Sequence, residues 1–333
     1  MRTCGNTFFD NYLKAELPVK SKFFGGIVKK DFLSITDLSH DEIFDVFQLA
    51  AELKEKTRKR ETHHLLKGYT MAMIFAKPSA RTRISFETGM YQLGGYALYL
   101  SPSDIGIGKR EAVKDIARVI SRYNDLIMAR LFNHEHIIEL AEFSSVPIIN
   151  GLTDYNHPCQ IMADAFTITE HLGKVENLKI TYIGDGNNVA NSWINFAARV
   201  PIHLVICSPR NFEPDAATLK NAQAENLSKI EITDDPVAAV KDADVVYTDV
   251  WASMGQESEA AERKKIFAPY QINDTLLHHA KKDVKVMHCL PAHRGDEITD
   301  EVMDGAHSIV FDEAENRMHV QKAIMVKLIQ NLK

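Results

Sequence analysis

Residues 69–76 read YTMAMIFA, and residues 77–83 directly after them read KPSARTR. The first segment is a short, largely apolar run, as expected of a buried β-strand. The second is rich in hydroxyl and guanidinium groups and precedes a segment with helical spacing of its apolar residues, which starts near Ile84. A buried strand followed by a polar loop and a helix is the repeating unit of an α/β protein with a parallel sheet.

The same unit recurs along the chain in two successive sets. We predict strands at residues 69–76, 96–100, 125–130, 146–150, 179–184, 203–207, 229–232, 244–249, 284–289 and 308–311. A helix that ends near Gly173 separates the two sets and marks the domain boundary, because glycine is common just after the end of a helix. The predicted fold class is therefore α/β, with two domains that are each a parallel sheet flanked by helices.

Length and composition limit the class of protein. The chain has 333 residues, which suggests two domains. It carries 45 acidic against 39 basic residues, a net charge of −6, which argues against nucleic acid because that binding relies on Lys and Arg. No apolar run approaches the ~18 residues of a membrane-spanning helix. We therefore expect neither nucleic acid nor a membrane among the partners.

The cysteines and the first residues bear on the compartment. The chain has no C-x-x-C pair among its four widely separated cysteines, Cys4, Cys159, Cys207 and Cys289. That usage fits a reducing compartment and predicts neither disulfides nor a metal site. Residues 1–30 have no apolar core and no A-x-A site of a secretory signal. We predict a cytoplasmic protein with an N-terminal extension over residues 1–30, the alternative being a degenerate organelle-targeting segment.

Loops that follow parallel strands are where ligands bind in α/β proteins. In the loop at 77–83, Ser79, Arg81 and Thr82 suit an anion, because free N–H groups and the helix dipole favour negative charge there. The alternative is that Ser79 or Thr82 only caps the helix. Arg130 ends the predicted strand 125–130, and it either faces the cleft or forms a surface ion pair.

Two further sets of loops carry candidate ligand groups. His157 and Gln160 are candidates to donate hydrogen bonds to a carbonyl oxygen, although a single histidine is more often structural. Asp249 and Cys289 end two strands and together suit an amine, one by charge and the other by a lone pair. The alternative for Cys289 is a small buried apolar residue.

Residues 184–188 read GDGNN after a predicted strand, which resembles the start of a dinucleotide-binding turn. Val189 stands where that motif requires a third glycine. We therefore predict no NAD site, and we interpret Asn187 and Asn188 as hydrogen-bonding groups for a small ligand.

Four of these motifs occur in a fixed order: SARTR at 79–83, HPCQ at 157–160, DVWASMG at 249–255 and HCLP at 288–291. In this order and at these separations they closely resemble the ornithine branch of the aspartate/ornithine carbamoyltransferase family. The first two are similar to motifs of carbamoyltransferases in general, and the last two to the ornithine-specific branch. The resemblance runs from about Lys29 to the C-terminus.

The resemblance implies an enzyme of arginine and citrulline metabolism that uses no cofactor. It would transfer the carbamoyl group of carbamoyl phosphate to the side-chain amine of L-ornithine, giving L-citrulline and phosphate. The implied carbamoyl phosphate ligands are Ser79, Ala80, Arg81, Thr82, Arg130, His157, Gln160, Cys289, Leu290 and Arg317. The implied ornithine ligands are Asn188, Asp249, Ser253 and Met254, and the implied catalytic residues are Arg130, His157, Asp249 and Cys289.

The resemblance also implies how the chain is divided and assembled. A carbamoyl phosphate-binding domain would take residues 31–168 plus 320–333, and an ornithine-binding domain residues 169–319, with two helices joining them. The Leu290-Pro291 bond would be cis. The protein would be a homo-oligomer, a trimer with active sites shared between subunits, and the S-M-G loop would close over ornithine.

One position departs from the pattern. Gly106 stands where many relatives carry Gln or His in the loop that reaches the neighbouring subunit's phosphate site. Either Lys109 or Arg110 replaces that contact, or the affinity for carbamoyl phosphate is lower.

Two other readings of the function remain open at this point. One is a non-catalytic relative that binds metabolites, against which the intact arginines, His157 and Cys289 argue. The other is an enzyme with a different amine acceptor, such as putrescine or an N-acylated ornithine.

Overall fold

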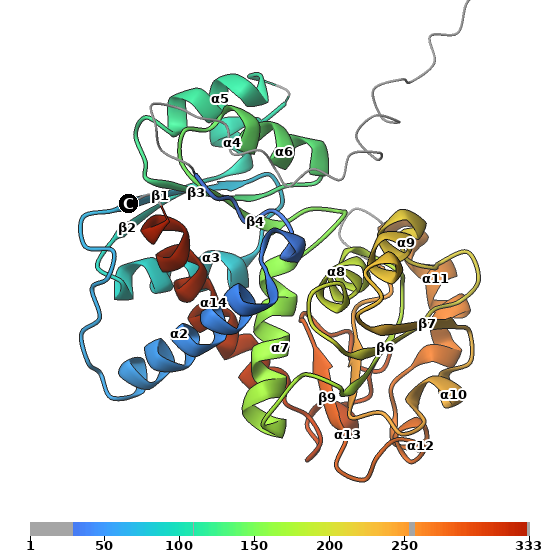
Figure 1. The fold of residues 1–333 in the computed structure, drawn as a ribbon. Helices are drawn as coiled ribbons and strands as arrows, with labels where there is room; N and C mark the ends of the chain where they lie inside the picture. Colours follow the sequence, from blue (N-terminus) through green and yellow to red (C-terminus); the bar gives the residue numbers. More distant parts are fainter. Residues whose placement is uncertain (1–28, 109, 253–256, 332–333) are drawn as a thin grey trace, which may run out of the picture.

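Two parallel sheets dominate the computed structural model, which describes residues 29–108, 110–252 and 257–331 (Figure 1). The first sheet has the order β2-β1-β3-β4, formed by β1 (Thr70–Phe75), β2 (Tyr96–Leu100), β3 (Leu126–Arg130) and β4 (Ile148–Leu152). The second has the order β7-β6-β5-β8-β9, formed by β5 (Lys179–Ile183), β6 (His203–Cys207), β7 (Lys229–Thr233), β8 (Val245–Thr248) and β9 (Lys285–His288).

Helices cover both faces of the first sheet, because its strands are apolar on both sides. Met71 and Met73 of β1 join one hydrophobic cluster, whereas Ala72 and Ile74 join another, as the two-residue period of a strand requires. Figure 1 shows one group of helices on each face. They are η1 (Ile35–Asp37), α2 (His40–Arg58), α3 (Ala80–Gln92), α4 (Pro102–Ile105), α5 (Val113–Ile120) and α6 (His134–Phe143).

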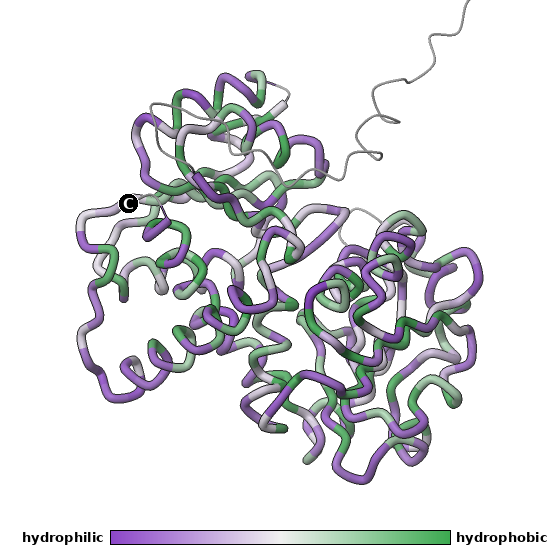
Figure 2. Tube along the Cα trace, viewed as in Figure 1, coloured by the Kyte–Doolittle hydropathy of each residue, from purple (hydrophilic) through white to green (hydrophobic). Residues whose placement is uncertain are grey.

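The second sheet is enclosed in the same way by shorter helices. These are α8 (Asn188–Ala197), α9 (Ala216–Ala224), α10 (Pro236–Val240), η2 (Glu257–Glu259), α11 (Ala260–Phe267), η3 (Ala268–Tyr270), α12 (Asp274–Leu277) and α13 (Asp300–Met303). Among the described residues, no helix is both long and apolar enough to cross a bilayer. Figure 2 accordingly shows hydrophilic and hydrophobic positions interleaved along the helices.

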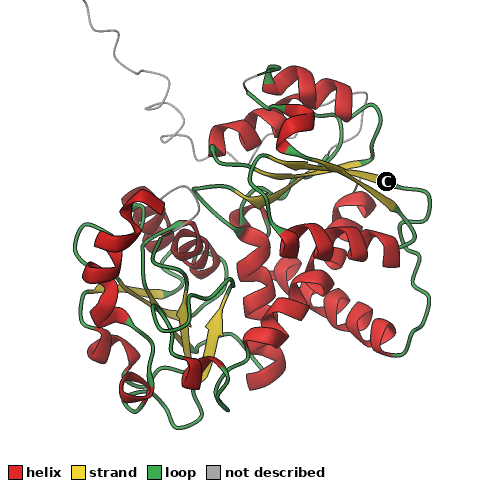
Figure 3. Ribbon diagram, turned by 180° about the vertical axis from the view of Figure 1, so that it is seen from behind, coloured by secondary structure: helices red, strands yellow, loops and turns green. Residues whose placement is uncertain are grey.

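Two long helices, α7 (Pro158–Leu172) and α14 (Val310–Gln330), join the two halves. They pack against each other between the sheets, as the opposite view in Figure 3 also shows. Pro158 occupies the first position of α7, and Gly173 ends it with a φ of +75°. The predicted fold class is therefore confirmed, whereas the residue borders of the two domains stay a prediction.

Two details of the sequence prediction were wrong. The predicted strand at 308–311 does not form: Ser308 makes one isolated bridge to Val286, and α14 begins at Val310. Asp312 and Glu313 lie in the first turn of α14, where acidic side chains favour the positive end of a helix. The helix predicted to start near Ile84 begins earlier, at Ala80, because Ser79 caps it.

Candidate active site

The hydroxyl group of Thr82 is the point where three elements meet. Thr82 is fully buried in the first turn of α3. Its Oγ1 accepts a hydrogen bond from Nη2 of Arg317 on α14 at 3.0 Å and lies 3.5 Å from the donor Nη1 of Arg130, the last residue of β3. The structure therefore gathers these three residues, which are far apart in the sequence, into one polar centre.

The two guanidinium groups at this centre are incompletely paired. Nε of Arg130 and Nε of Arg317 are both buried without a hydrogen-bond partner in the part of the chain that the structure describes. Burial, with the charges of Arg317 and Arg81, lowers the pKa of Arg130 to about 9. Burial also lowers the pKa of Arg317. Buried cations with unused donors are energetically costly unless an anion joins them, so this centre suits an anionic ligand.

The N-terminus of α3 opens at the same place. Ser79 is its cap, and its Oγ accepts from the backbone N of Thr82 at 3.3 Å. The capping role that the sequence left as an alternative is therefore present. It leaves the remaining free N–H groups of the first turn, near Ala80 and Arg81, as donors for an anion.

His157 lies next to these arginines at the start of α7. It is buried, and its backbone N donates to Oγ of Ser192 at 2.7 Å. Burial and the charges of Arg317, Arg130 and Lys77 hold the pKa of His157 well below its usual value, so its imidazole is neutral. Its Nδ1 has no partner among the described residues and is available to a ligand.

The amide nitrogen of Gln160 faces two acidic side chains and is not available to a ligand. Nε2 donates to Oδ1 of Asp164 at 2.8 Å and to Oε1 of Glu313 at 3.1 Å. Its Oε1 is buried and has no partner in the described part of the chain. Donation from Gln160 to a carbonyl oxygen does not fit this geometry, because both amide hydrogens are engaged by carboxyl groups.

Asp249 and Cys289 lie side by side beyond the ends of β8 and β9. Sγ of Cys289 donates to Oδ1 of Asp249 at 3.0 Å, and Nδ2 of Asn187 donates to Oδ2 at 2.8 Å. Burial and the charge of Asp249 raise the pKa of the Cys289 thiol well above its usual value. Cys289 is therefore a neutral thiol, and only the carboxylate of Asp249 offers charge to an amine.

The two asparagines at the start of α8, Asn187 and Asn188, make different hydrogen bonds. Asn187 caps the helix, with Oδ1 accepting from the backbone N of Val189 at 2.9 Å. Nδ2 of Asn188 donates to the backbone O of Thr153 at 2.7 Å and so ties α8 to the loop after β4. Asn187 thus caps α8 and holds Asp249, and a contact of either asparagine with a small ligand stays a prediction. The implied ornithine ligands Ser253 and Met254 lie outside the described residues.

The donor atoms of Asp249, His288 and Cys289 lie within 4.8 Å of one another, a set that suits Zn²⁺ by type. Both ring nitrogens of His288 are already used, however. Nε2 lies 3.0 Å from Oε1 of the buried Glu297, and Nδ1 accepts from the backbone N of Leu290 at 2.9 Å. A metal would have to break one of these bonds. The Leu290-Pro291 bond is cis, as the resemblance implied.

Several polar residues around the site were missed by sequence reasoning. Asp164 and Glu313 contact Gln160, and Lys77 pairs with Asp154 at 3.2 Å beside the same loops. A signal for Asp164 was present, because it interrupts the apolar stripe of Ile161 and Ile168 on α7. Glu313 was missed because the start of α14 was predicted as a strand at 308–311, so the first turn of the helix was not recognised.

Gly106 has a local structural reason. It ends α4 with a φ of +50°, and a Cβ atom there would lie 2.9 Å from Cβ of Arg110. A glutamine or histidine at this position would therefore strain the loop. The implied substitute Lys109 lies outside the described residues.

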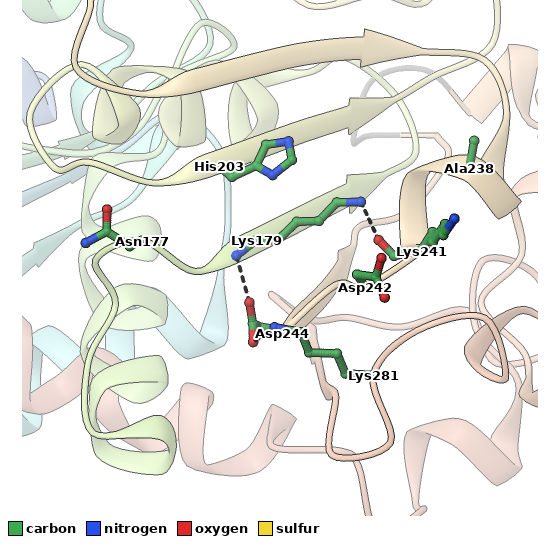
Figure 4. Close-up of a pocket in the computed structure, with 8 residues that line it drawn as sticks. All are labelled: Asn177, Lys179, His203, Ala238, Lys241, Asp242, Asp244 and Lys281. Atoms are coloured by element: carbon green, nitrogen blue, oxygen red, sulfur yellow. Dashed lines mark hydrogen bonds and ion pairs between the residues drawn. The ribbon is translucent and has the colours of Figure 1, made fainter.

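A cavity of about 500 Å³ lies elsewhere, at the amino ends of β5 and β6 (Figure 4). Its lining includes Lys179, His203 and Asp244, and Lys179 donates its backbone N to Asp244 at 2.9 Å. This cavity shares no lining residue with the centre around Thr82, and it lies at the opposite end of the second sheet from Asp249 and Cys289.

Comparison with known proteins identifies the chain's relatives. Residues 30–170 match the carbamoyl-P binding domain of aspartate/ornithine carbamoyltransferase, and residues 176–328 match the Asp/Orn binding domain. The chain is 53% identical to the chloroplastic ornithine carbamoyltransferase of Pisum sativum over 95% of its length and 84% of that protein. It is 55% identical to the ornithine carbamoyltransferase of Syntrophus aciditrophicus over 91% of its length and 100% of that protein.

A solved structure agrees with these sequence matches. The ornithine carbamoyltransferase of Pyrococcus furiosus superimposes with a TM-score of 0.87 at 48% identity, covering 92% of this chain and 98% of that one. Sequence and fold thus agree over nearly the whole described chain, and the protein belongs to the aspartate/ornithine carbamoyltransferase family.

Proposed function

We propose that this protein is an ornithine carbamoyltransferase, which transfers the carbamoyl group of carbamoyl phosphate to the side-chain amine of L-ornithine. The observation that carries the proposal is the pair of buried, incompletely paired arginines at Thr82, next to the Asp249 and Cys289 pair. Cys289 is among the groups that influence the pKa of Arg130 and of Arg317, so the two sites are neighbours. One site suits a phosphate dianion, and the other suits an amine.

The carbamoyl phosphate site is proposed to comprise Ser79, Ala80, Arg81, Thr82, Arg130, His157, Gln160, Cys289, Leu290 and Arg317. The arginines and the N-terminus of α3 hold the phosphate. The neutral imidazole of His157 and the guanidinium of Arg130 stabilise the negative charge that develops on the carbonyl oxygen when the carbon is attacked. Fixed donors of this kind stabilise such a charge without reorganisation of solvent.

The ornithine site is proposed to comprise Asn188, Asp249, Ser253 and Met254. The neutral side-chain amine attacks the carbamoyl carbon, a C–N bond forms, and the C–O bond to phosphate breaks. The departing phosphate takes the electron pair and is a suitable acceptor for the proton that the amine loses. Cys289 stays a thiol and donates to Asp249, so no covalent enzyme intermediate is needed.

We further propose a homo-oligomer, a trimer with shared active sites. β2 is an edge strand of its sheet and exposes Tyr96 and Leu98, and α3 beside it exposes Tyr91 at 78%. Edge strands with exposed apolar side chains favour association. Light scattering tests the mass, and Tyr96→Glu with Leu98→Glu should lower it to that of one chain. The predicted compartment is the cytoplasm, with organelle targeting by residues 1–30 as the alternative.

A citrulline assay on the purified protein tests the activity directly. We expect citrulline from carbamoyl phosphate and ornithine, and rates with putrescine or N-acetylornithine at least ~100-fold lower, since a site built to pair polar groups rejects ligands that lack them. Absence of citrulline would favour the non-catalytic reading. Equal rates with putrescine would contradict the ornithine site.

A further inference from the structure

Gln160 sits against a buried pair of acidic residues that the reaction itself does not use. Asp164 lies on α7 and Glu313 on α14, and both are buried. Oε2 of Glu313 accepts from the backbone N of His288 at 3.0 Å, and its Oε1 lies 3.3 Å from the hydroxyl of Tyr247. We call Asp164 and Glu313 the acid pair. It connects both long helices to β8 and β9.

The acid pair determines which way the Gln160 amide faces. A glutamine amide has one acceptor oxygen and one nitrogen with two hydrogens. Both hydrogens are used, one by Asp164 at 2.8 Å and one by Glu313 at 3.1 Å. Turning the amide over would place its oxygen against acceptor oxygens. Since the His288 backbone N and the Tyr247 hydroxyl already donate to Glu313, this wall presents acceptors to Gln160.

The other end of the amide is therefore an acceptor without a partner. Oε1 of Gln160 is buried and unpaired among the described residues. His157 is the cap residue before α7, and the backbone N of Gln160 donates to its carbonyl O at 3.1 Å, so the two residues lie one turn apart. Nδ1 of His157 is unpaired as well. A buried acceptor next to the anion site calls for a ligand that carries N–H or O–H groups.

We propose that Asp164 and Glu313 are positioning residues that fix Gln160 as a hydrogen-bond acceptor and so select a carbamoyl group over an acetyl group. This inference rests on the proposed function. Carbamoyl phosphate and acetyl phosphate have the same shape and the same phosphate, but the first has an NH₂ where the second has a CH₃. Only the NH₂ donates to Oε1, so acetyl phosphate leaves this acceptor buried and unpaired.

The electrostatics fit this role. Burial raises the pKa of Asp164 to about 7, and burial with the charge of Asp164 raises the pKa of Glu313 well above its usual value. The pair therefore does not hold two full charges near neutral pH. The two carboxyl groups hydrogen-bond each other, so the shared proton is held between them and the oxygens that face Gln160 still accept. The pair's remaining negative charge lies near Arg317, whose charge in turn lowers the pKa of Asp164.

The test measures selectivity, which a merely structural role would not change. The readout is the inhibition constant of acetyl phosphate divided by the KM of carbamoyl phosphate. In Asp164→Asn and in Glu313→Gln, the carboxyl group becomes an amide that can also donate. The Gln160 amide is then free to rotate by about 180° and exchange its oxygen and nitrogen. We expect this ratio to fall by about tenfold or more, as expected when a discriminating buried hydrogen bond is lost.

The control is Glu170→Gln, the same chemical change further along α7. Glu170 binds Lys54 at 2.7 Å and Asn316 at 2.6 Å, and no hydrogen bond joins it to Gln160 in the described residues. Its ratio should stay at the wild-type value. Thermal unfolding shows whether each variant is folded. If Asp164→Asn does not fold, Glu313→Gln provides the test.

A double-mutant cycle isolates the route through Gln160. Gln160→Leu removes the acceptor and should lower the ratio as much as the acid-pair variants do. Adding Asp164→Asn to Gln160→Leu should then change nothing further. A wild-type ratio in folded Asp164→Asn and Glu313→Gln, or a further drop in the combined variant, would overturn the proposal. A wild-type protein that makes no citrulline would overturn the proposed function instead.

Discussion

Arg317 and Lys322 lie on the same helix, α14, and both are almost fully buried cations, yet their surroundings differ. Nζ of Lys322 donates to Oγ1 of Thr57 and to Oε1 of Gln92, both at 2.8 Å, and lies 3.3 Å from Nε2 of His63. Neutral acceptors thus surround it. Arg317 donates to Thr82, but its Nε remains unpaired among the described residues.

The two environments distinguish a buried cation that stabilises the fold from one that binds a ligand. Burying a cation costs free energy unless its donors are paired. The protein meets that requirement around Lys322 with its own side chains. At Arg317 the missing partner is an anion from outside, so the unpaired donors mark the binding site.

Replacing Arg317 by methionine should produce the largest effect. We expect kcat/KM for carbamoyl phosphate to fall about 10²- to 10³-fold, because a fixed donor to an anion is lost. The thermal midpoint should stay or rise, since a positive charge that acts on Arg130 is removed. Citrulline kinetics and thermal unfolding of the same preparation measure both.

Lys322→Met is the matched control for this first prediction. It should leave the KM for carbamoyl phosphate within about twofold, because it acts away from the site. If Arg317→Met lost stability but kept its KM for carbamoyl phosphate, Arg317 would be a structural cation and not part of the binding site.

Inorganic phosphate should distinguish the two cations without any turnover. A ligand at 100 times its Kd stabilises the folded state by about 2.7 kcal/mol, which raises the thermal midpoint by several degrees. We expect this rise in the wild type and in Lys322→Met, and little or none in Arg317→Met. A scan of midpoint against phosphate concentration measures it. An equal rise in all three proteins would mean that phosphate binds elsewhere.

The pH dependence of stability should reveal the lowered pKa of Lys322. Burial lowers its pKa to about 8, whereas an unfolded lysine titrates near 10.4. Between these values the unfolded chain holds a proton that the native one has lost, so stability gains from rising pH, by about 1.4 kcal/mol per unit of pKa difference.

The measurement compares two proteins. The free energy of unfolding of the wild type, relative to Lys322→Met, should rise between pH 8 and about pH 10.4. Chemical denaturation at several pH values gives this difference, in which groups shared by both proteins largely cancel. A flat difference would show that Lys322 titrates as it does in water.

The sequence predicted the strands well because each one is a short apolar run that stops at polar residues. Arg130 and Asp249 were found for the same reason, since their strands end at the edge where ligands bind. The strand at 308–311 was wrong because an apolar run of that length also fits a helix start, and acidic residues after it decided the outcome.

The contacts that complete the site were beyond the sequence. Asp164 and Glu313 meet only because α7 and α14 pack together, although 148 residues separate them. The same holds for Lys54, which pairs with Asn316 at 2.7 Å. Local periodicity carries no information about such pairs, so buried polar contacts between distant helices appear only in the structure.

Cys289 gives the smallest expected effect and tests the same rule on a neutral group. Its thiol already donates to Asp249, and its pKa is raised, so it is neither an unpaired donor nor a thiolate. Cys289→Ser keeps a donor to Asp249, and we expect kcat to fall by less than about tenfold. Iodoacetamide should react slowly at pH 7.5, because only the thiolate attacks it. Fast alkylation, or a loss of activity as large as that of Arg317→Met, would mean that the thiol takes part in the reaction. A hydrogen bond within the protein would then not distinguish a structural group from a functional one.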